Sequence, residues 1–158
     1  MVASSGTTSA RRALAQLAHA DLEMSATLAD DHDWHVREEL AWATTHPEIL
    51  ERLLGDVHPQ VRGMVARNPK ITSSQRRALA KDPQAVTRAI VATCENCPDD
   101  ILFELAQDKS ANVRFCLTLH GKNRPLMELL MNDSDSTVAD TARSSLSRPP
   151  LSGAELFP

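Results

Sequence analysis

Acidic and basic residues recur along the chain at a fixed spacing and could bind one another or a ligand. Five aspartates lie 25, 26, 26 and 25 residues apart, and a valine or threonine lies five residues after each of them. An arginine comes directly after that residue in four of the five units, whereas Ala139 stands there in the last. Carboxylate and guanidinium groups form bidentate, charge-assisted hydrogen bonds. The pairs are Asp31 and Arg37, Asp56 and Arg62, Asp82 and Arg88, and Asp108 and Arg114, with Asp133 left over.

The four arginines form either a ligand-binding row or one half of a structural ladder. An isolated buried charge is costly, so charged groups inside a fold need partners. Because aspartate and arginine recur together, we predict that each arginine meets an aspartate of its own or the adjacent unit. We call these eight paired residues the Asp/Arg ladder, and we expect it to hold successive units in register rather than to bind a ligand.

Three cysteines and one histidine could bind a metal or carry out redox chemistry. Cys94 and Cys97 form a Cys-x-x-Cys motif, and Cys116 and His120 lie at helical spacing in the next unit. Zinc needs four such ligands. Small buried thiols are more common than metal ligands in a helical core, so we predict neither a metal nor a cofactor. Four other histidines fit no established metal pattern and are expected to be solvated or to cap helices: His32, His35, His46 and His58.

A period of 25 or 26 residues predicts a stack of short repeats with two helices in each unit. The first helix ends near the aspartate, because a leucine always lies three residues before it and an apolar residue usually lies one turn earlier. The second helix contains the arginine, and the positions one before and two, three and six after it are expected to face the core. A half-unit is expected at the N-terminus, with Arg12 in the arginine position and Leu14, Ala15 and Ala18 in the core.

One segment resembles the leucine-rich repeat variant family: Val61-Arg62-Gly63-Met64-Val65-Ala66-Arg67-Asn68-Pro69, with the leucine-containing helix that follows up to Asp82. The Asp-to-Val-Arg spacing also resembles the second helix of HEAT repeats, whose units are longer. The resemblance implies short helices paired in a right-handed superhelix, and it names no function. A founding member of the variant family carries a cysteine-ligated iron–sulfur cluster in an N-terminal module. This chain has no cysteine before Cys94, so that cofactor is not expected.

We therefore predict an all-α fold, a right-handed α-solenoid of about five two-helix units over residues 12–146. Residues 1–11 are expected to form a flexible segment and residues 147–158 an irregular tail. Hydrophobic residues make up 42% and charged residues 24% of the chain, which is typical of a soluble globular protein. The chain shows no secretory signal and no apolar run that could span a bilayer, and its odd cysteine count argues against a disulfide framework. A cytoplasmic monomer is the resulting prediction.

Function is expected on the side of the second helix that faces away from the core. On a helical wheel, positions one, four and five after the arginine point outward. In superhelical repeats the second helices line the concave side, so the non-repeating residues there would contact a partner. The alternative is that a terminal segment of the chain covers the apolar ones. The predicted partner-binding residues are Glu38, Trp42, Arg67, Thr93, Phe115 and Leu119.

We favour a non-enzymatic scaffold that binds a protein or peptide, because the chain contains no nucleotide-binding loop, metalloprotease helix or nucleophile elbow. Seven basic residues and one acidic residue lie between Arg62 and Arg88, which suggests an acidic partner. The alternative is a nucleic-acid-binding protein, similar to the alkylpurine DNA glycosylases built from HEAT-like repeats, with Trp34, Trp42 and Glu38 on its concave face. The net charge of −4 argues against that alternative.

Overall fold

The structure is a computed structural model, and it describes residues 7–17, 21–121 and 123–147. These ranges hold eleven α-helices and one short 3-10 helix, and no strand, so the prediction of an all-α fold is confirmed. None of the described helices combines the length and the apolar character needed to cross a bilayer. The helices are α1 (Thr8–Leu17), α2 (Leu22–Ala29), α3 (Trp34–Ala43), α4 (Pro47–Leu54), α5 (Pro59–Val65), α6 (Ser73–Leu79), α7 (Ala85–Ala92), α8 (Asp99–Leu105), α9 (Ala111–Leu117), η2 (Thr118–His120), α10 (Arg124–Leu130) and α11 (Ser136–Ser147).

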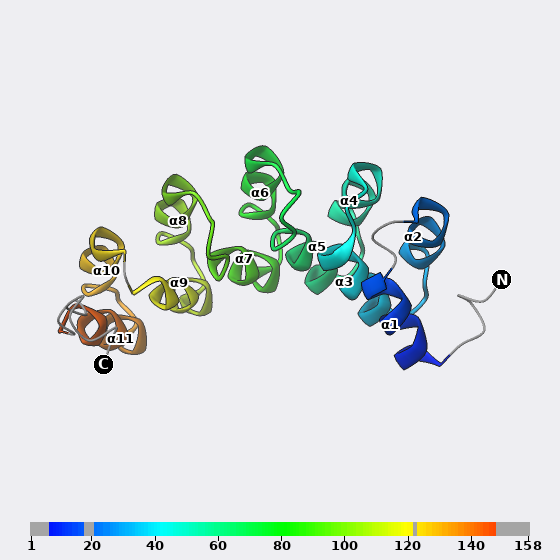
Figure 1. Cartoon of the computed structure of the whole chain (residues 1–158). Coiled ribbons are helices and arrows are strands. Elements are labelled where there is room, and N and C mark those ends of the chain that lie inside the picture. Colours follow the sequence, from blue (N-terminus) through cyan, green and yellow to red (C-terminus); the bar gives the residue numbers. More distant parts are fainter. Residues whose placement is uncertain (1–6, 18–20, 122, 148–158) are drawn as a thin grey trace, which may run out of the picture.

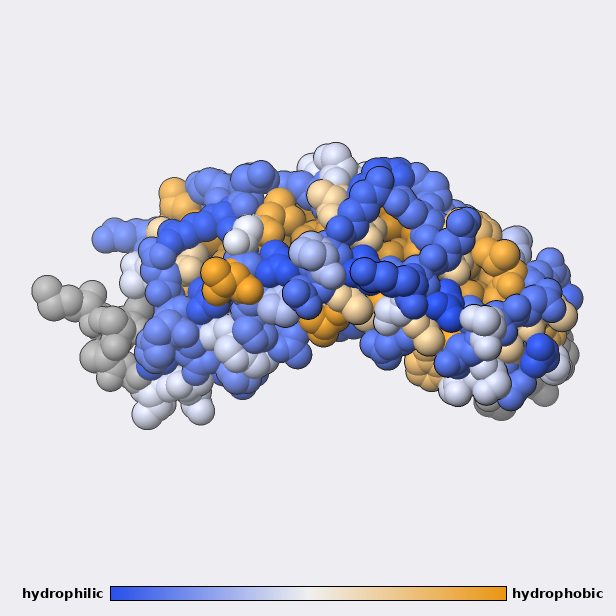
Figure 2. Space-filling view, turned by 180° about the vertical axis from the view of Figure 1, so that it is seen from behind, coloured by the Kyte–Doolittle hydropathy of each residue, from blue (hydrophilic) through white to orange (hydrophobic). Residues whose placement is uncertain are grey.

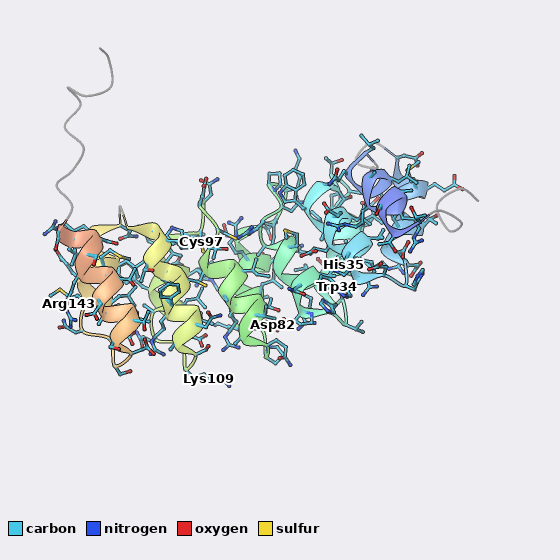
Figure 3. All side chains as sticks on the ribbon, turned by 90° about the horizontal axis from the view of Figure 1, so that it is seen from below. Trp34, His35, Asp82, Cys97, Lys109 and Arg143 are labelled. Carbon is cyan, nitrogen blue, oxygen red and sulfur yellow. The ribbon has the colours of Figure 1, made fainter. Side chains whose placement is uncertain are left out.

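The α-helices alternate between two rows (Figure 1). The even-numbered helices form an outer row, the odd-numbered helices form an inner row, and the molecule curves like an arch with the inner row on its hollow side. Each inner helix packs against the next inner helix from α1 to α11, and each outer helix packs on the inner helix that follows it in the chain. Seen from below, the inner helices lie side by side, with Asp82 and Lys109 at one edge and Cys97 at the other (Figure 3).

The outer helices are held down by the leucine that lies three residues before each aspartate. This leucine is buried in every unit, and its carbonyl oxygen accepts the backbone N–H of the aspartate at 3.0 to 3.2 Å. Burying one such side chain contributes about 1.5–3 kcal/mol. Helices of seven or eight residues are unstable alone, so this packing is what maintains them. The leucines are Leu28, Leu53, Leu79, Leu105 and Leu130.

The inner helices bury two faces rather than one. Position three after the arginine was expected to face the core, and Leu40, Val65, Val91 and Leu117 are buried there. The expectation that position four faces outward is wrong, because Ala41, Ala66, Ala92 and Thr118 are also buried. An inner helix has an inner neighbour on each side, so small residues at position four lie in a helix–helix contact. Position two, expected to face the core, is instead half-buried: Glu39, Met64, Ile90 and Cys116.

Gly63 shows how closely two inner helices approach. It is buried in α5, and a Cβ atom placed on it would lie 2.4 Å from Cδ1 and 3.0 Å from Cβ of Ile90 in α7. Real Cβ atoms essentially never approach another heavy atom so closely. A side chain at this position would therefore force Ile90 to shift, and the absence of one permits the contact between α5 and α7.

The first and last described helices extend beyond the predicted limits of the repeat domain. Helix α1 begins at Thr8, within the segment of residues 1–11 that was expected to be flexible. Ala15 is buried as predicted, whereas Ala18 lies outside the described residues. At the other end α11 runs to Ser147, and the remainder of the expected tail, residues 148–158, also lies outside the described part of the chain.

Candidate functional site

Each ladder arginine reaches forward to the aspartate of the next unit. Arg62 donates from Nε to Oδ2 of Asp82 at 2.6 Å and from Nη2 to Oδ1 at 2.9 Å. Its Nη1 donates to the backbone oxygen of Asp56, the aspartate of its own unit, at 2.6 Å. One guanidinium group therefore bridges two successive aspartate turns. The same three bonds occur at Arg37, Arg88 and Arg114.

Each ladder aspartate also closes the turn at the start of an inner helix. The Oδ1 atom of Asp82 accepts the backbone N–H of Gln84 at 2.8 Å, and the corresponding bond recurs at every unit. Burial alone would raise the pKa of Asp82, but the hydrogen bonds from Arg62 and Gln84 outweigh burial and lower it. At Asp133 the hydrogen bond from Arg114 is the dominant cause, and the pKa is again lowered. The carboxylates are thus held in their charged form.

The N-terminal member of the ladder is Arg11, not Arg12. Arg11 is buried, and its Nε donates to Oδ2 of Asp31 at 2.7 Å. Arg12 instead donates from Nη2 to Oε1 of Glu39 at 2.6 Å. The expectation of Arg12 came from the 19 residues that separate Arg37 and Asp56. Other pairs are separated by 20 residues, because the units vary in length by one.

Asp133 belongs to the ladder although its own unit has no arginine. Its two oxygens accept Nε and Nη2 of Arg114 at 2.7 and 2.8 Å. Because pairing runs from one unit to the next, an aspartate needs only the arginine of the preceding unit. Ala139, which occupies the arginine position, is buried.

A second set of hydrogen bonds joins successive inner helices through position six after the arginine. Asn68 is completely buried, and its Nδ2 donates to the carbonyl oxygens of Ala41, Trp42 and Thr44 at 2.8 to 3.0 Å. In the next units the Sγ of Cys94 donates to Ala66 at 3.4 Å, and Nε2 of His120 lies 2.7 Å from the oxygen of Ala92. A carbonyl can only accept, so this His120 nitrogen carries a proton. Nothing in the sequence pattern had predicted these contacts.

The cysteines show the properties of buried structural thiols. Burial raises the pKa of Cys97 to about 11, and it also raises the pKa values of Cys94 and Cys116. The thiolate is the form that binds metals and attacks disulfides, so it is scarce here at neutral pH. Within the described ranges, no three His, Cys, Asp or Glu side chains are grouped so that they could hold a metal ion.

Trp34 lies beside His35 at the start of α3 (Figure 3). Its ring stacks on His35 at a centroid distance of 3.7 Å and on His58 at 4.0 Å. Asp33 caps α3 by accepting the backbone N–H of His35 at 3.0 Å. The hydrogen bond with the His35 ring is the main cause that lowers the pKa of Asp33 to about 2. Trp34 is half-buried in this cluster, unlike the exposed Trp42.

Most cations of the central basic band, residues 62–88, form ion pairs with acidic residues of the same chain. Arg62 and Arg88 bind ladder aspartates, while Arg77 and Lys81 pair with acidic residues of α8. Four of the seven cations are therefore in ion pairs. A fifth, Arg76, donates to the carbonyl oxygens of Ala66 and Asn96. The excess of basic residues in this stretch reflects acidic partners about 20 residues further along, so it does not by itself indicate an acidic ligand.

The predicted partner-binding residues divide between the inner surface and the helix contacts beside it. At position five Trp42 and Leu119 are 54% and 69% exposed, Arg67 is exposed and Thr93 is half-buried. At position one Phe115 is 38% exposed and Glu38 is half-buried. The equivalents of Glu38 in α5 and α7 are Gly63 and Ala89, and both are buried against neighbouring helices. In α5 and α7 the residues at position two, Met64 and Ile90, are therefore more accessible than those at position one.

A depression of about 280 Å³ lies between α3 and α5 on this inner surface, lined by Glu38, Glu39, Trp42, Met64 and Arg67. All five lining residues come from positions one, two and five, and Met64 and Glu39 had not been predicted. Arg67 donates from Nη2 to Oγ1 of Thr93 at 2.6 Å, which ties it to α7 and the next unit. The space-filling outline is hollowed along its lower edge, and hydrophobic patches reach that edge (Figure 2).

A larger depression of about 480 Å³ lies between α4 and α6 in the outer row. Its charged lining residues already have partners: Glu51 accepts from Gln75, Lys81 pairs with Glu104, and Asp82 pairs with Arg62. It offers no unpaired charge and no exposed aromatic ring among its lining residues. The inner depression is therefore the stronger candidate for a binding site.

The chain matches no family model, no curated protein and no solved structure. The candidate site therefore rests on its own geometry: exposed Trp42, Phe115 and Leu119 on a row of helices that the Asp/Arg ladder joins.

Proposed function

We propose that the chain is a non-enzymatic scaffold that binds a protein or peptide partner along its inner helices. In this proposal it is a right-handed α-solenoid of five two-helix units, similar to the leucine-rich repeat variant and HEAT-like proteins. Such a stack presents an extended concave surface, which suits an extended segment of a partner. The presence of three free cysteines within the described residues supports a reducing, cytoplasmic setting.

The observation that carries the proposal is the pair of apolar anchors on the inner row. Trp42 lies on α3, the second helix of the row, and Phe115 lies three inner helices further along on α9, with Leu119 just after it in η2. Exposed aromatic side chains on a rigid surface are the typical hot spots of protein interfaces. The ladder and the position-six hydrogen bonds fix the helices that display them, so a partner would meet a preorganised surface.

Nucleic-acid binding is the weaker proposal. It depended on the basic band, and four of the seven cations of that band are paired within the fold. It also needed Trp34 as a free aromatic, whereas Trp34 stacks on His35 and His58. A gel-shift experiment at low salt, in which phosphate contacts are strongest, would reveal any remaining affinity.

The proposed function is tested by selecting random twelve-residue peptides from a display library on the immobilised protein. We expect peptides whose binding is reduced at least about tenfold by Trp42→Ala or by Phe115→Ala combined with Leu119→Ala. Val57→Ala is the matched control, because Val57 is 90% exposed but lies in the turn before α5 rather than on the inner helices. The proposal would be contradicted if the selected peptides bound all of these variants as tightly as the wild type. It would also be contradicted if Val57→Ala weakened binding as much as the inner-row substitutions.

A further inference from the structure

We propose that the depression between α3 and α5 receives a lysine or arginine side chain of the bound segment, between the carboxylate of Glu38 and the ring of Trp42. This inference rests on the proposed function and names the chemistry of the partner at one subsite. It replaces the expectation of an acidic partner, which came from the basic band.

The first support is the state of Glu38. Its carboxylate accepts no hydrogen bond and forms no ion pair with any residue of the described ranges, although it is half-buried. The adjacent Glu39 is different, because it accepts from Arg12 at 2.6 Å and from Gln16 at 3.0 Å. Burial and the adjacent Glu39 raise the pKa of Glu38, and together they outweigh the lowering effect of Arg12, His35 and His58. The compensation of its charged form is therefore incomplete in the free protein. A cation from a partner would supply that compensation.

The second support is the position of Trp42. It lies four residues after Glu38 on α3, and side chains at this spacing share one face of a helix. Both residues line the same depression, and Trp42 is 54% exposed. A cation held against an indole face is attracted by the ring quadrupole, and tryptophan is the best ring for this contact. Carboxylate and ring together therefore favour a basic side chain over a purely apolar one.

The remaining lining residues fit the rest of such a segment. Met64 offers an apolar surface to the methylene stem of lysine or arginine, whose charged end alone needs a polar partner. Arg67 lies on the α5 side and is drawn toward α7 by its bond to Thr93. Its other N–H groups can donate to a backbone carbonyl of an extended segment. The depression thus has an acidic end at α3 and a donor end at α5.

The test is a parallel selection of random twelve-residue display peptides on the wild-type protein, on Glu38→Gln and on Glu38→Lys. Among peptides that depend on Trp42, we expect lysine and arginine to be enriched on the wild type and not on Glu38→Gln. A selected basic peptide should bind Glu38→Gln about fivefold more weakly, and its Lys→Glu version should bind Glu38→Lys better than it binds the wild type. Glutamine keeps the shape of Glu38, and circular dichroism with unfolding curves checks that each variant is folded.

The outcomes separate the inference from the proposed function. Peptides that depend on Trp42 but show no basic preference, or a basic preference that Glu38→Gln leaves unchanged, would overturn the inference and leave the scaffold intact. Enrichment of acidic residues would overturn it as well. A selection that yields no peptide dependent on Trp42, Phe115 or Leu119 would overturn both.

Discussion

Arg62 holds the carboxylate of Asp82 with two nitrogens and the backbone carbonyl of Asp56 with the third, so one side chain joins the turns of two successive units. The pair is nearly excluded from water, with side-chain exposures of 13% and 6%. The bond geometry is repeated from Arg37 to Arg114, which gives the stack a periodic polar seam beside its apolar core. Because this seam pairs every arginine it contains, we expect its primary role to be setting the spacing between units.

Replacing Arg62 with alanine should therefore lower the free energy of unfolding by about 3–5 kcal/mol, since Asp82 would remain buried without its cation. Urea unfolding followed by circular dichroism measures the change. Arg77→Ala is the matched control, because its pair with Asp100 is largely exposed and should matter little. Arg62→Lys should recover only part of the loss, because one ammonium group cannot make the bidentate contact. Equal effects of the two alanine variants would contradict the structural role.

The ladder also predicts a loss of stability in acid. The pKa values of Asp56, Asp82, Asp108 and Asp133 are lowered in the folded protein, so the unfolded chain binds protons more readily. Their contribution is fully present above the unfolded pKa of about 3.9 and is lost as the pH falls through the lower folded values. Unfolding midpoints should change little from this cause between pH 7 and pH 5 and fall steeply below about pH 4. Asp82→Asn should show a shallower fall, and an unchanged acid slope would argue against the ladder as its source.

The cysteines should react slowly in the folded protein. A pKa of about 11 at Cys97, against an ordinary value of 9.0, corresponds to a roughly hundredfold smaller thiolate fraction near neutral pH. Labelling with Ellman's reagent at pH 7.5 should therefore be slow in buffer, and all three thiols should react rapidly in guanidinium chloride. Cys116 is half-buried, so Cys116→Ala separates its reaction from those of Cys94 and Cys97. Fast labelling of Cys97 in the folded Cys116→Ala variant would support the redox alternative instead.

Local chemistry explains why much of this arrangement was predictable. The turn at Asp82 is closed by its own side chain and by Leu79, three residues earlier, so the aspartate period marks each turn directly. The two-helix pattern follows from the leucine and valine positions on either side of that turn. These contacts involve residues close together in the chain, and their spacing is visible without a structure.

The errors arose where neighbours distant in sequence decide the outcome. Arg11 and Arg12 are adjacent, and only the packing of α1 on α3 determines which of them meets Asp31. A helical wheel assumes one buried face, so it could not show that Ala66 lies between two inner helices. The sequence alone suggests that Arg77 is free to bind an acidic ligand, whereas in the fold it pairs with Asp100, which lies 23 residues later.

Gly63 gives the sharpest test of how closely the inner helices pack. Alanine is normally better than glycine in a helix by about 1 kcal/mol. Here its Cβ would meet Ile90 at 2.4 Å, so we expect Gly63→Ala to be destabilising on balance, with an overpacking cost of about 1–3 kcal/mol. Gly55→Ala is the matched control, because its Cβ would lie 3.6 Å from the carbonyl oxygen of Arg52, which is ordinary contact. Chemical unfolding of both variants compares them directly.

Ile90→Val identifies the cause of that difference. It removes the Cδ1 atom that Gly63→Ala would strike, so the cost of Gly63→Ala should be smaller in the Ile90→Val background than in the wild type. The same close approach places Gly63 against α7 instead of on the inner surface, so the proposed partner contacts in this unit fall to Met64 and Arg67. If Gly63→Ala were no more destabilising than Gly55→Ala, the close contact between Gly63 of α5 and Ile90 of α7 would be contradicted. Gly63 would then count again among the residues that a partner could reach.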